Sequence, residues 1–459
     1  MSVFLGQIFE LQGEWWLPEN PSQKVKGALR FTPKEGGILR LDVFPSGSVE
    51  IEHFQQPQII LGVSIDGRKV TLHTCLMKEM VKHALADGTQ TTVLTLYVGV
   101  ILVGAQFKKI EDAKFDSMFI RFQHLDAWVN VSGFNIDVSA DGISVKYQRP
   151  KDYVFEVSEK LKLHISYAVH YPTISTIQNE ACITQEAWIG IIPSEPKPLD
   201  YYWDIIYSLQ NFLILATTAT VYPLSVSGRI KVKDQPNISV DIYRSIGSIE
   251  SSESLHPSDM LFTFNNVSEQ LHTLMANWFA KSDTLKPFYD LYFGTYYVSE
   301  MYLTTEFLNY VQALESYHRR TKSNVEIPED QHRKRFETVV TGAPPEYKEW
   351  LVEKLRYSNE PNLRKRLKEI LKSFPASLEP VLKDRRKFVN DVCVTRNYLT
   401  HYDSELEHQA AKDRELFALT SRVKLLLQFC MLKELGFDPQ NVEKLTARLI
   451  NMRYGFLYH

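Results

Sequence analysis

Cysteine is scarce in this sequence, and none of the four cysteines has a partner nearby. Cys75, Cys182, Cys393 and Cys430 lie far apart, and no Cys-x-x-Cys pair or neighbouring histidine cluster is present. This spacing argues against a disulfide framework and against a structural zinc site. We therefore expect four buried free thiols and no metal site.

The signatures of several enzyme classes are also missing. The sequence contains no Gly-x-x-x-x-Gly-Lys phosphate loop, no Gly-x-Gly-x-x-Gly, no His-Glu-x-x-His and no Gly-x-Ser-x-Gly. Nucleotide hydrolase, dehydrogenase, zinc protease and serine hydrolase interpretations therefore lack support. We expect no cofactor.

No long, uninterrupted apolar run is present. Residues 93–107 carry no charge but form a short segment rich in β-branched residues, and residues 205–224 are broken by polar side chains and Pro223. Both segments are therefore expected to be buried core rather than membrane spans. The start of the chain does not resemble a signal peptide, since the first lysine is Lys24, and we expect a cytoplasmic protein without membrane contact.

Charge is distributed unevenly along the 459 residues, a length that predicts two or three domains. Residues 315–459 contain 27 Lys and Arg against 21 Asp and Glu, so this part has an excess of six positive charges. The net charge of the whole chain is −3, which leaves nine net negative charges for the rest. A basic C-terminal part suits contact with RNA, although basic surface runs are common.

The first half of the chain has the pattern of β structure. Short runs alternate between apolar and polar residues at 39–43, 63–65, 70–72 and 161–165. Glycine-containing turn signals separate such runs because glycine adopts left-handed conformations without a Cβ penalty. These signals are Gly36-Gly37, Ser46-Gly47, Asp66-Gly67, Asp87-Gly88 and Asp141-Gly142. We predict a sandwich-like or barrel-like β-rich domain over residues 1–195.

The next region, residues 196–288, is predicted to be a mixed connecting region of the N-terminal half with a helix near 201–218. From residue 289 the apolar period changes from two to 3.6, which predicts a helical domain over 289–459. Its first long helix carries an apolar face made by Leu303, Phe307, Tyr310, Val311 and Leu314. A charged insert around 321–380 follows, and then helices are predicted over 382–400 and 404–435.

Arg396 continues the apolar stripe of the helix predicted over 382–400. The stripe consists of Val389, Val392, Cys393, Arg396 and Leu399. A guanidinium on an apolar face is unfavourable unless an anion meets it. The anion is either Glu315, on the matching stripe of the first helix, or a phosphate, which arginine can bind with two parallel hydrogen bonds.

His401 lies five residues after Arg396, in the hexapeptide RNYLTH of residues 396–401. On a continuous helix the two side chains would point about 140° apart, at about 100° per residue. They converge only if the helix ends. Residues 404–407 have the Ser-x-x-Glu form of a capping box, so we expect a new helix to start there and His401 to lie at a junction. A structural hydrogen-bonding histidine is the alternative.

The hexapeptide resembles the motif of HEPN-domain ribonucleases, in which Arg, a polar residue, a short spacer and His follow one another. Residues 307–315 and 394–397 resemble the HEPN domain of ApeA-like anti-phage proteins, and residues 11–18 and 128–134 resemble the β-rich N-terminal domain of those proteins. Together the two resemblances, of the N-terminal half and of about the last 150 residues, cover nearly the whole chain. The resemblance implies an α+β multidomain fold, with a β-rich domain followed by an all-α HEPN bundle.

The resemblance also implies an activity, that of a metal-independent endoribonuclease acting in abortive infection. Such an enzyme uses the ribose 2′-hydroxyl as nucleophile and leaves a 2′,3′-cyclic phosphate. His401 would move the proton, Arg396 would stabilise charge on the phosphate and Asn397 would orient either group, with Glu315 and Tyr402 in support. Expected partners are an RNA such as a tRNA or mRNA, a phage-derived trigger and a second copy of the chain.

Other interpretations remain open. The helices could form a non-catalytic module that binds RNA, a nucleotide or a protein, or could serve only for oligomerisation beside a β-rich sensor of phage. The stripe of Val389, Val392 and Cys393 could be the docking face of a second copy. It could equally pack against the first and last helices of its own bundle.

Overall fold

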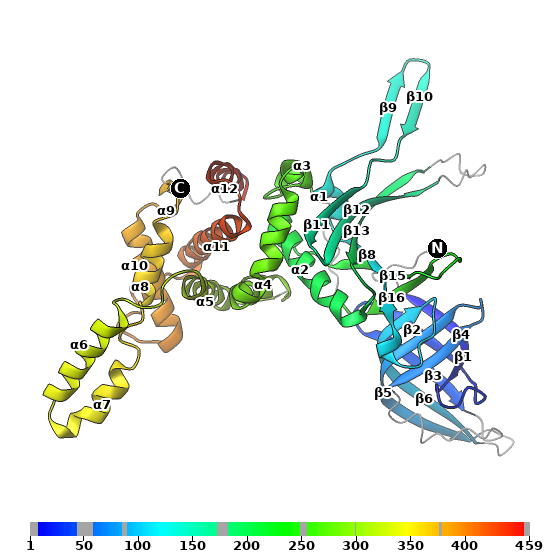
Figure 1. Ribbon diagram of the computed structural model, residues 1–459, viewed down its shortest axis with the longest axis horizontal. Coiled ribbons are helices and arrows are strands. Elements are labelled where there is room, and N and C mark those ends of the chain that lie inside the picture. The colour runs from blue at the N-terminus through cyan, green and yellow to red at the C-terminus, as the bar shows by residue number, and fades with distance from the viewer. Residues whose placement is uncertain are drawn as a thin grey trace. The chain divides into compact units, whose positions relative to one another are not determined.

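The computed structural model describes residues 8–43, 58–84, 90–171, 182–247, 255–298, 300–375 and 379–453. The chain divides into two compact units, Met1–His272 and Thr273–His459. This division lies inside the region predicted to be a connection. Residues 196–247 supply a helix and three strands to the first unit and therefore belong to it. The order of a β-rich part followed by a helical part is confirmed (Figure 1).

The first six strands of the described chain close into a ring. These strands are β1 (Phe9–Trp16), β2 (Val25–Thr32), β3 (Gly36–Val43), β4 (Ile59–Ser64), β5 (Lys69–Ala84) and β6 (Gln90–Val103). The antiparallel order β6-β3-β2-β1-β4-β5 is completed by pairing of β5 with β6, from Val70↔Val103 to Ala84↔Gln90. The sequence predicts individual strands and a barrel-like sheet. The pairing of β5 with β6, the two longest of these six strands, closes this sheet into the ring.

The ring is filled by alternating side chains, among which Trp15 is the largest. Trp15 is fully buried, and its indole Nε1 donates a hydrogen bond of 3.2 Å to the carbonyl oxygen of Gly27. Gly62 is required beneath the indole, because a Cβ there would lie 2.3 Å from the ring. At the β4–β5 turn Gly67 has φ +83°, as the turn signal predicts. The predicted turns at 46–47 and 87–88 lie outside the described residues.

The same sheet continues beyond the ring through β16, which pairs with residues 100–103 of β6. Its remaining strands are β8 (Ser117–Phe122), β11 (Tyr153–Ser158), β12 (Leu161–His170), β13 (Thr184–Pro193), β15 (Pro223–Ile230) and β16 (Ile238–Arg244). A separate short pair joins β7 (Lys114–Phe115) to β14 (Lys197–Pro198). Short helical segments are η2 (Ile110–Asp112), α1 (Leu125–Val129), η3 (Pro257–Asp259) and α3 (Phe264–Val267).

Both apolar runs of the sequence belong to this unit. The first forms most of β6, and the second forms α2 (Leu199–Thr217), which is buried along most of its length. The hydroxyl of Tyr202 on α2 donates a 2.6 Å hydrogen bond to the carbonyl oxygen of Phe115. The expectation of buried core is confirmed. No helix in the described part of the chain has both the length and the apolar character to cross a membrane.

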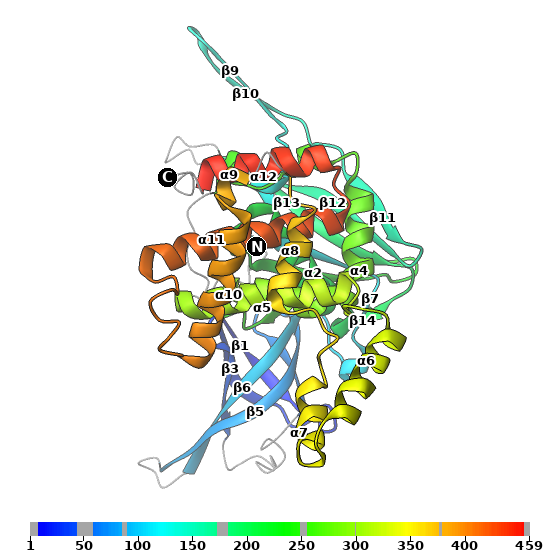
Figure 2. The ribbon, with the colours of Figure 1, turned by 90° about the vertical axis from the view of Figure 1, so that its left-hand side faces the viewer.

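A two-stranded hairpin extends away from the large sheet (Figures 1 and 2). It consists of β9 (Phe134–Ser139) and β10 (Gly142–Tyr147). The cross-strand pairs Val138↔Ile143 and Ile136↔Val145 place four apolar side chains on one face, and all four are more than half exposed.

The second unit is helical. Its helices are α4 (Leu271–Phe293, beginning just before the division), η4 (Gly294–Tyr296), α5 (Leu303–Thr321), α6 (Glu329–Gly342), α7 (Pro345–Leu355), α8 (Leu363–Leu371), α9 (Glu379–Leu382), α10 (Arg385–His401), α11 (Asp413–Leu435) and α12 (Pro439–Arg453). The predicted apolar face of the first long helix is that of α5, where Phe307, Tyr310 and Leu314 are fully buried. The helices α5, α8, α10 and α11 pack against one another, whereas α6 and α7 form an arm without a buried residue.

The predicted helix start at Ser404 is wrong. Residues 404–409 form turns, and α11 begins at Asp413. The Asp403 carboxylate accepts a 3.0 Å hydrogen bond from the backbone N–H of Glu405, as a helix N-cap does. No α-helix follows, because the N–H groups of Leu406 and Gln409 bond to carbonyl oxygens only three residues back and Lys412 is extended. The loop is also held to α10, because the N–H of Ala411 donates to the Thr395 hydroxyl at 3.0 Å.

The structure decides between the two alternatives for the stripe of α10. Val389, Val392 and Cys393 are buried within the unit, so this stripe packs in its own bundle and is not an exposed docking face. The expectation of four buried thiols needs one correction. Among the cysteines, Cys75, Cys393 and Cys430 are buried free thiols as expected, but Cys182 is exposed.

Candidate active site

The hexapeptide occupies the C-terminal end of α10. Asp384 is the N-cap residue of this helix. Its carboxylate accepts hydrogen bonds from the backbone N–H groups of Arg386 (2.6 Å) and Lys387 (3.1 Å). The helix ends at His401, because Tyr402 adopts a left-handed conformation with φ 52° and ψ 38°. The motif therefore lies on the last turns of a helix whose buried face is fixed by α5, α8 and α11.

Arg396 has the anionic partner that the sequence offers as one alternative. Its Nη2 lies 3.6 Å from Oε2 of Glu315 on α5, and its Nη1 donates a 3.1 Å hydrogen bond to Oδ1 of Asn397. Both side chains of the ion pair are partly exposed, which limits the stabilisation to about 1 kcal/mol or less. A guanidinium has five N–H donors, so these contacts orient Arg396 while leaving it capable of binding an external anion.

His401 is not brought to the Arg396 side of the helix. It is the last residue of α10, so the two residues remain on one continuous helix and diverge by about 140° around its axis. The imidazole is exposed, and within the described residues it has no hydrogen bond or ion pair. Asn397 is also exposed and contacts Arg396 rather than His401. One copy of the chain thus presents the arginine and the histidine in different directions.

Tyr398 contacts both Tyr402 and Lys412, and neither Tyr398 nor Lys412 was among the predicted site residues. Tyr402 is 70% exposed, and its ring meets the Tyr398 ring edge-on, with centroids 5.7 Å apart and an interplanar angle of 65°. Lys412 places its Nζ 5.8 Å from the centre of the Tyr398 ring. The tyrosine pair could have been predicted from the sequence, because residues four positions apart are neighbours on a helix surface. The position of Lys412 could not, because it depends on the path of the loop between α10 and α11.

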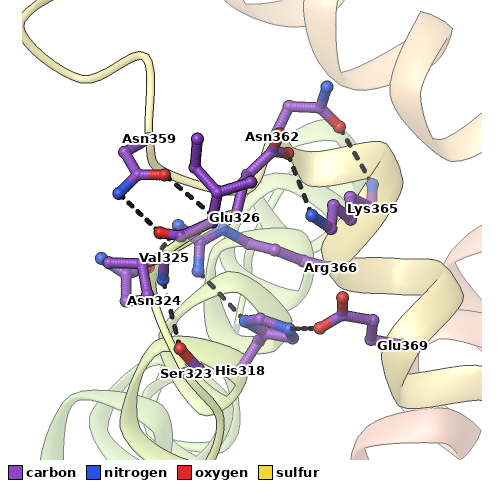
Figure 3. Close-up of polar contacts among 11 residues, drawn as sticks. His318, Ser323, Asn324, Val325, Glu326, Asn359, Asn362, Lys365, Arg366 and Glu369 are labelled. Atoms are coloured by element: carbon purple, nitrogen blue, oxygen red, sulfur yellow. Dashed lines mark hydrogen bonds and ion pairs between the residues drawn. The ribbon is translucent and has the colours of Figure 1, made fainter. Parts of the chain in front are cut away.

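A second set of polar residues, also absent from the sequence predictions, lies inside the same unit (Figure 3). The ring of His318 on α5 is fully buried between Arg366 and Glu369 of α8. Its Nε2 is 2.6 Å from Oε2 of Glu369, and its Nδ1 is 3.1 Å from Nη1 of Arg366. Because arginine can only donate, Nδ1 is the acceptor, and the proton of a neutral His318 is on Nε2, facing Glu369.

Hydrogen bonds also hold the base of the α6–α7 arm. On the chain that enters the arm, Asn324 accepts a 2.7 Å hydrogen bond at Oδ1 from Nη2 of Arg366. On the chain that leaves the arm, Asn359 accepts a 3.1 Å hydrogen bond from the N–H of Ile327 and donates to the Ile327 carbonyl oxygen at 3.1 Å. The hydrogen bond from His318 holds the pKa of Glu369 below its ordinary value. The contacts of this set are all internal, which is typical of a structural role.

A small cationic cavity of about 360 Å³ lies between α10 and α11. Its charged lining comprises Lys383, Lys387, Asp391, Arg414, Glu415 and Arg422. Lys387 is paired with Asp391 at 2.9 Å, which neutralises part of the positive charge. Within the described chain, no three His, Cys, Asp or Glu side chains are grouped so as to hold a metal ion.

Comparison with protein families accounts for both units. Residues 10–278, more than half of the chain, match the family described as ApeA N-terminal domain 1. The chain belongs to the ApeA family. Residues 308–441 match the ApeA-like HEPN family, so Glu315, Arg396, Asn397, His401 and Tyr402 all lie in the HEPN domain. Comparison with curated proteins and with solved structures gave no match.

Membership of the ApeA family confirms the resemblance seen in the sequence. It also supports the coarser functional expectation, a HEPN nuclease effector of anti-phage defence. The HEPN match begins in α5 and ends in α12, so it contains α8, α10, α11 and the α6–α7 arm. The site residues and the reaction chemistry remain predictions.

Proposed function

We propose that this ApeA-family protein is a metal-independent endoribonuclease effector of anti-phage defence, with His401 as its acid–base group and Arg396 as its electrostatic clamp. The observation that carries the proposal is the exposed imidazole of His401 at the end of α10, inside the HEPN match. Most histidines with a structural role have hydrogen-bond partners, as His318 has. His401 is available to a substrate.

The proposed reaction needs one proton to be taken up and one to be returned. A base removes the proton of a ribose 2′-hydroxyl, and the 2′-oxygen attacks the adjacent phosphorus. The bond to the 5′-oxygen then breaks, and an acid protonates that oxygen. The products are a 2′,3′-cyclic phosphate and a free 5′-hydroxyl. Histidine suits either proton transfer because its unperturbed pKa lies near neutral pH, and Arg396 would stabilise the charge that develops on the phosphate.

Glu315 and Asn397 are proposed to position Arg396. Glu315 approaches Nη2 and Asn397 accepts from Nη1, so the two contacts fix the plane of the guanidinium. A fixed guanidinium can offer two parallel hydrogen bonds to phosphate oxygens.

A second copy of the chain is proposed to complete the site. Arg396 and His401 diverge on α10 of one copy, so a single phosphate is better served by the arginine of one copy and the histidine of another. The α10 ends of a homodimer would then line a shared groove. Light scattering of the purified protein should report at least a dimer, and a strictly monomeric protein that cleaves RNA at full rate would contradict the shared site.

The alternative is a non-catalytic HEPN module that binds RNA, a nucleotide or a protein, with the β-rich unit as sensor. The ion pair of Arg396 with Glu315 favours this alternative, since it gives the arginine a structural reason to be there. If the protein is a nuclease, we propose that its substrate is an RNA such as a tRNA or mRNA and that a phage-derived trigger activates it.

The deciding experiment incubates the purified full chain with total RNA in excess EDTA and analyses the new RNA ends. Cleavage with 2′,3′-cyclic phosphate and 5′-hydroxyl ends, absent from His401→Ala, would support the enzyme. RNA binding without cleavage would support the alternative. Cleavage that requires added magnesium would contradict the proposed chemistry.

A further inference from the structure

Tyr402 occupies a position that its residue type does not suit. It follows the last residue of α10 in the left-handed region, with φ 52°, where glycine and asparagine are favoured and other side chains are strained. Tyr402 is 70% exposed, so burial of its side chain does little to offset this strain. Thr218 ends α2 in the same conformation, so the backbone alone does not mark a site. The exposed aromatic ring next to the candidate catalytic His401 is what sets Tyr402 apart.

The surroundings of Tyr402 form a surface with a definite chemistry. Tyr402 and Tyr398 meet edge to face, and the N–H of Tyr402 donates a 2.6 Å hydrogen bond to the carbonyl oxygen of Tyr398, which fixes their relative positions. The Lys412 ammonium lies near the Tyr398 ring and also pairs with Glu407 at 3.0 Å. Such an exposed ion pair is weak, so Lys412 can exchange its partner for a phosphate.

We infer that Tyr402, Tyr398 and Lys412 form a platform that binds a nucleobase of single-stranded RNA next to the scissile phosphate. The inference rests on the proposed ribonuclease function. The Tyr402 ring offers its exposed surface to a base, and Lys412 is placed for the neighbouring phosphate. His401, which is exposed and adjacent to Tyr402 in the chain, would act on the ribose between them.

The platform has consequences for the substrate. A base can stack on an aromatic side chain only when it is free of its neighbour in a helix, so the RNA must be single-stranded at this point. Every base has a flat π face, so the platform tolerates many sequences. It would therefore select loops and unpaired segments rather than a defined sequence.

The test compares Tyr402→Asn with Tyr402→Phe in the full chain. Asparagine removes the ring yet suits the left-handed conformation, whereas phenylalanine keeps the ring. The probe is a fluorescein-labelled single strand with 2′-O-methyl riboses, which lack the attacking hydroxyl, and binding is followed by fluorescence anisotropy. Loss of a base stack should raise the Kd of Tyr402→Asn by about 5-fold to 100-fold and leave Tyr402→Phe near wild type.

A matched control is Tyr302→Asn. Tyr302 is 84% exposed and occupies the N-cap position of α5, about 20 Å along that helix from Glu315. Asparagine suits a helix N-cap, so this variant removes an exposed tyrosine ring without harming the helix. It should bind the probe as wild type does. The Tm of Tyr402→Asn should be equal to or above that of wild type, because the backbone strain is relieved.

A strand with abasic sites separates stacking from other effects. Wild type should bind the abasic strand as weakly as Tyr402→Asn binds the intact strand, and Tyr402→Asn should not distinguish the two. If wild type binds and cleaves RNA but Tyr402→Asn behaves identically, or if the variant weakens binding to both strands equally, the platform is refuted and the ribonuclease proposal stands. If wild type neither binds nor cleaves any RNA, the proposed function fails and the platform fails with it.

Discussion

The helical unit contains two sets of histidine, arginine and glutamate, and they differ in almost everything except composition. In the first, His318, Arg366 and Glu369 join α5 to α8, and the histidine and arginine are buried (Figure 3). In the second, Arg396 and Glu315 join α10 to α5 at the looser distance of 3.6 Å, and His401 faces solvent. One set is enclosed by the protein and the other is open.

The difference shows why residue type alone does not identify an active site. Both nitrogens of the His318 ring have protein partners, so the ring has no capacity left for a substrate. A buried and paired arginine such as Arg366 stabilises the fold mainly because its removal leaves other buried polar groups unpaired. The open set contributes little to stability, so its residues are free to act on an external molecule.

The largest effect is expected for His401→Ala. The variant should lose about 10²-fold to 10⁴-fold in RNA cleavage rate, because it removes a general acid–base group. Its unfolding should be unchanged, since His401 is exposed. Single-turnover cleavage and thermal denaturation measure the two effects. His408→Ala, an exposed histidine of the following loop, is the control, and equal loss in both variants would contradict a special role for His401.

The second prediction concerns the enclosed set. Arg366→Met should lower the free energy of unfolding by about 3–5 kcal/mol, because it breaks a buried ion-pair network and leaves His318 and Asn324 without a donor. Urea denaturation measures this loss. Arg364→Met, two residues earlier on the exposed side of α8, should cost less than about 1 kcal/mol. Similar losses in the two variants would mean that burial does not distinguish them.

A smaller effect is expected for Glu315→Gln. The exposed ion pair with Arg396 contributes about 1 kcal/mol or less, so stability should barely change. Cleavage should fall, because Arg396 is less firmly oriented, but by less than the roughly 10²-fold to 10³-fold loss expected when an electrostatic donor is removed in Arg396→Ala. A Glu315→Gln variant as inactive as Arg396→Ala would assign Glu315 a direct role in the reaction.

The smallest effect is a dependence of stability on pH. The hydrogen bond from His318 lowers the pKa of Glu369 in the folded protein below its ordinary value of 4.5. The stabilisation is therefore present above about pH 4.5 and is lost as the pH falls through the lowered value. Urea denaturation between pH 3 and pH 7 should show a slightly flatter pH dependence for Glu369→Gln than for wild type. Parallel curves would exclude this linkage.

The sequence predicts the elements of the fold better than their connections. The strand at 39–43 and the face of α5 follow from apolar periodicity, which is a local property. Closure of the ring is not local, since it depends on β5 meeting β6 along its whole length. The start of α11 was misplaced because the cap at Asp403 is followed by short turns, and the N–H of Ala411 bonds to Thr395 on α10, a contact that is not local in the sequence.

In the helical unit, too, local features could be predicted and long-range contacts could not. The motif and the partner of Arg396 could be predicted, because both follow from helical spacing on α10 and α5. The buried set of His318, Arg366 and Glu369 could not, since Arg366 stands in a run of three basic residues, a pattern typical of a solvated helix face. Only Arg366 shares the buried face of α8 with Leu367 and Ile370, and its partner His318 is 48 residues away in the sequence. Helical phase decides which charge of such a run is buried.

The place of β6 in the sheet has a consequence for how the chain folds. One edge of β6 pairs with β5, but the other is shared between β3, at residues 92–98, and β16, at residues 100–103. The ring can close as soon as β6 has been synthesised, whereas the edge at 100–103 stays unpaired until residues 241–244 follow. During that interval, and in any fragment that ends before β16, this open edge is a template on which another chain can add a strand.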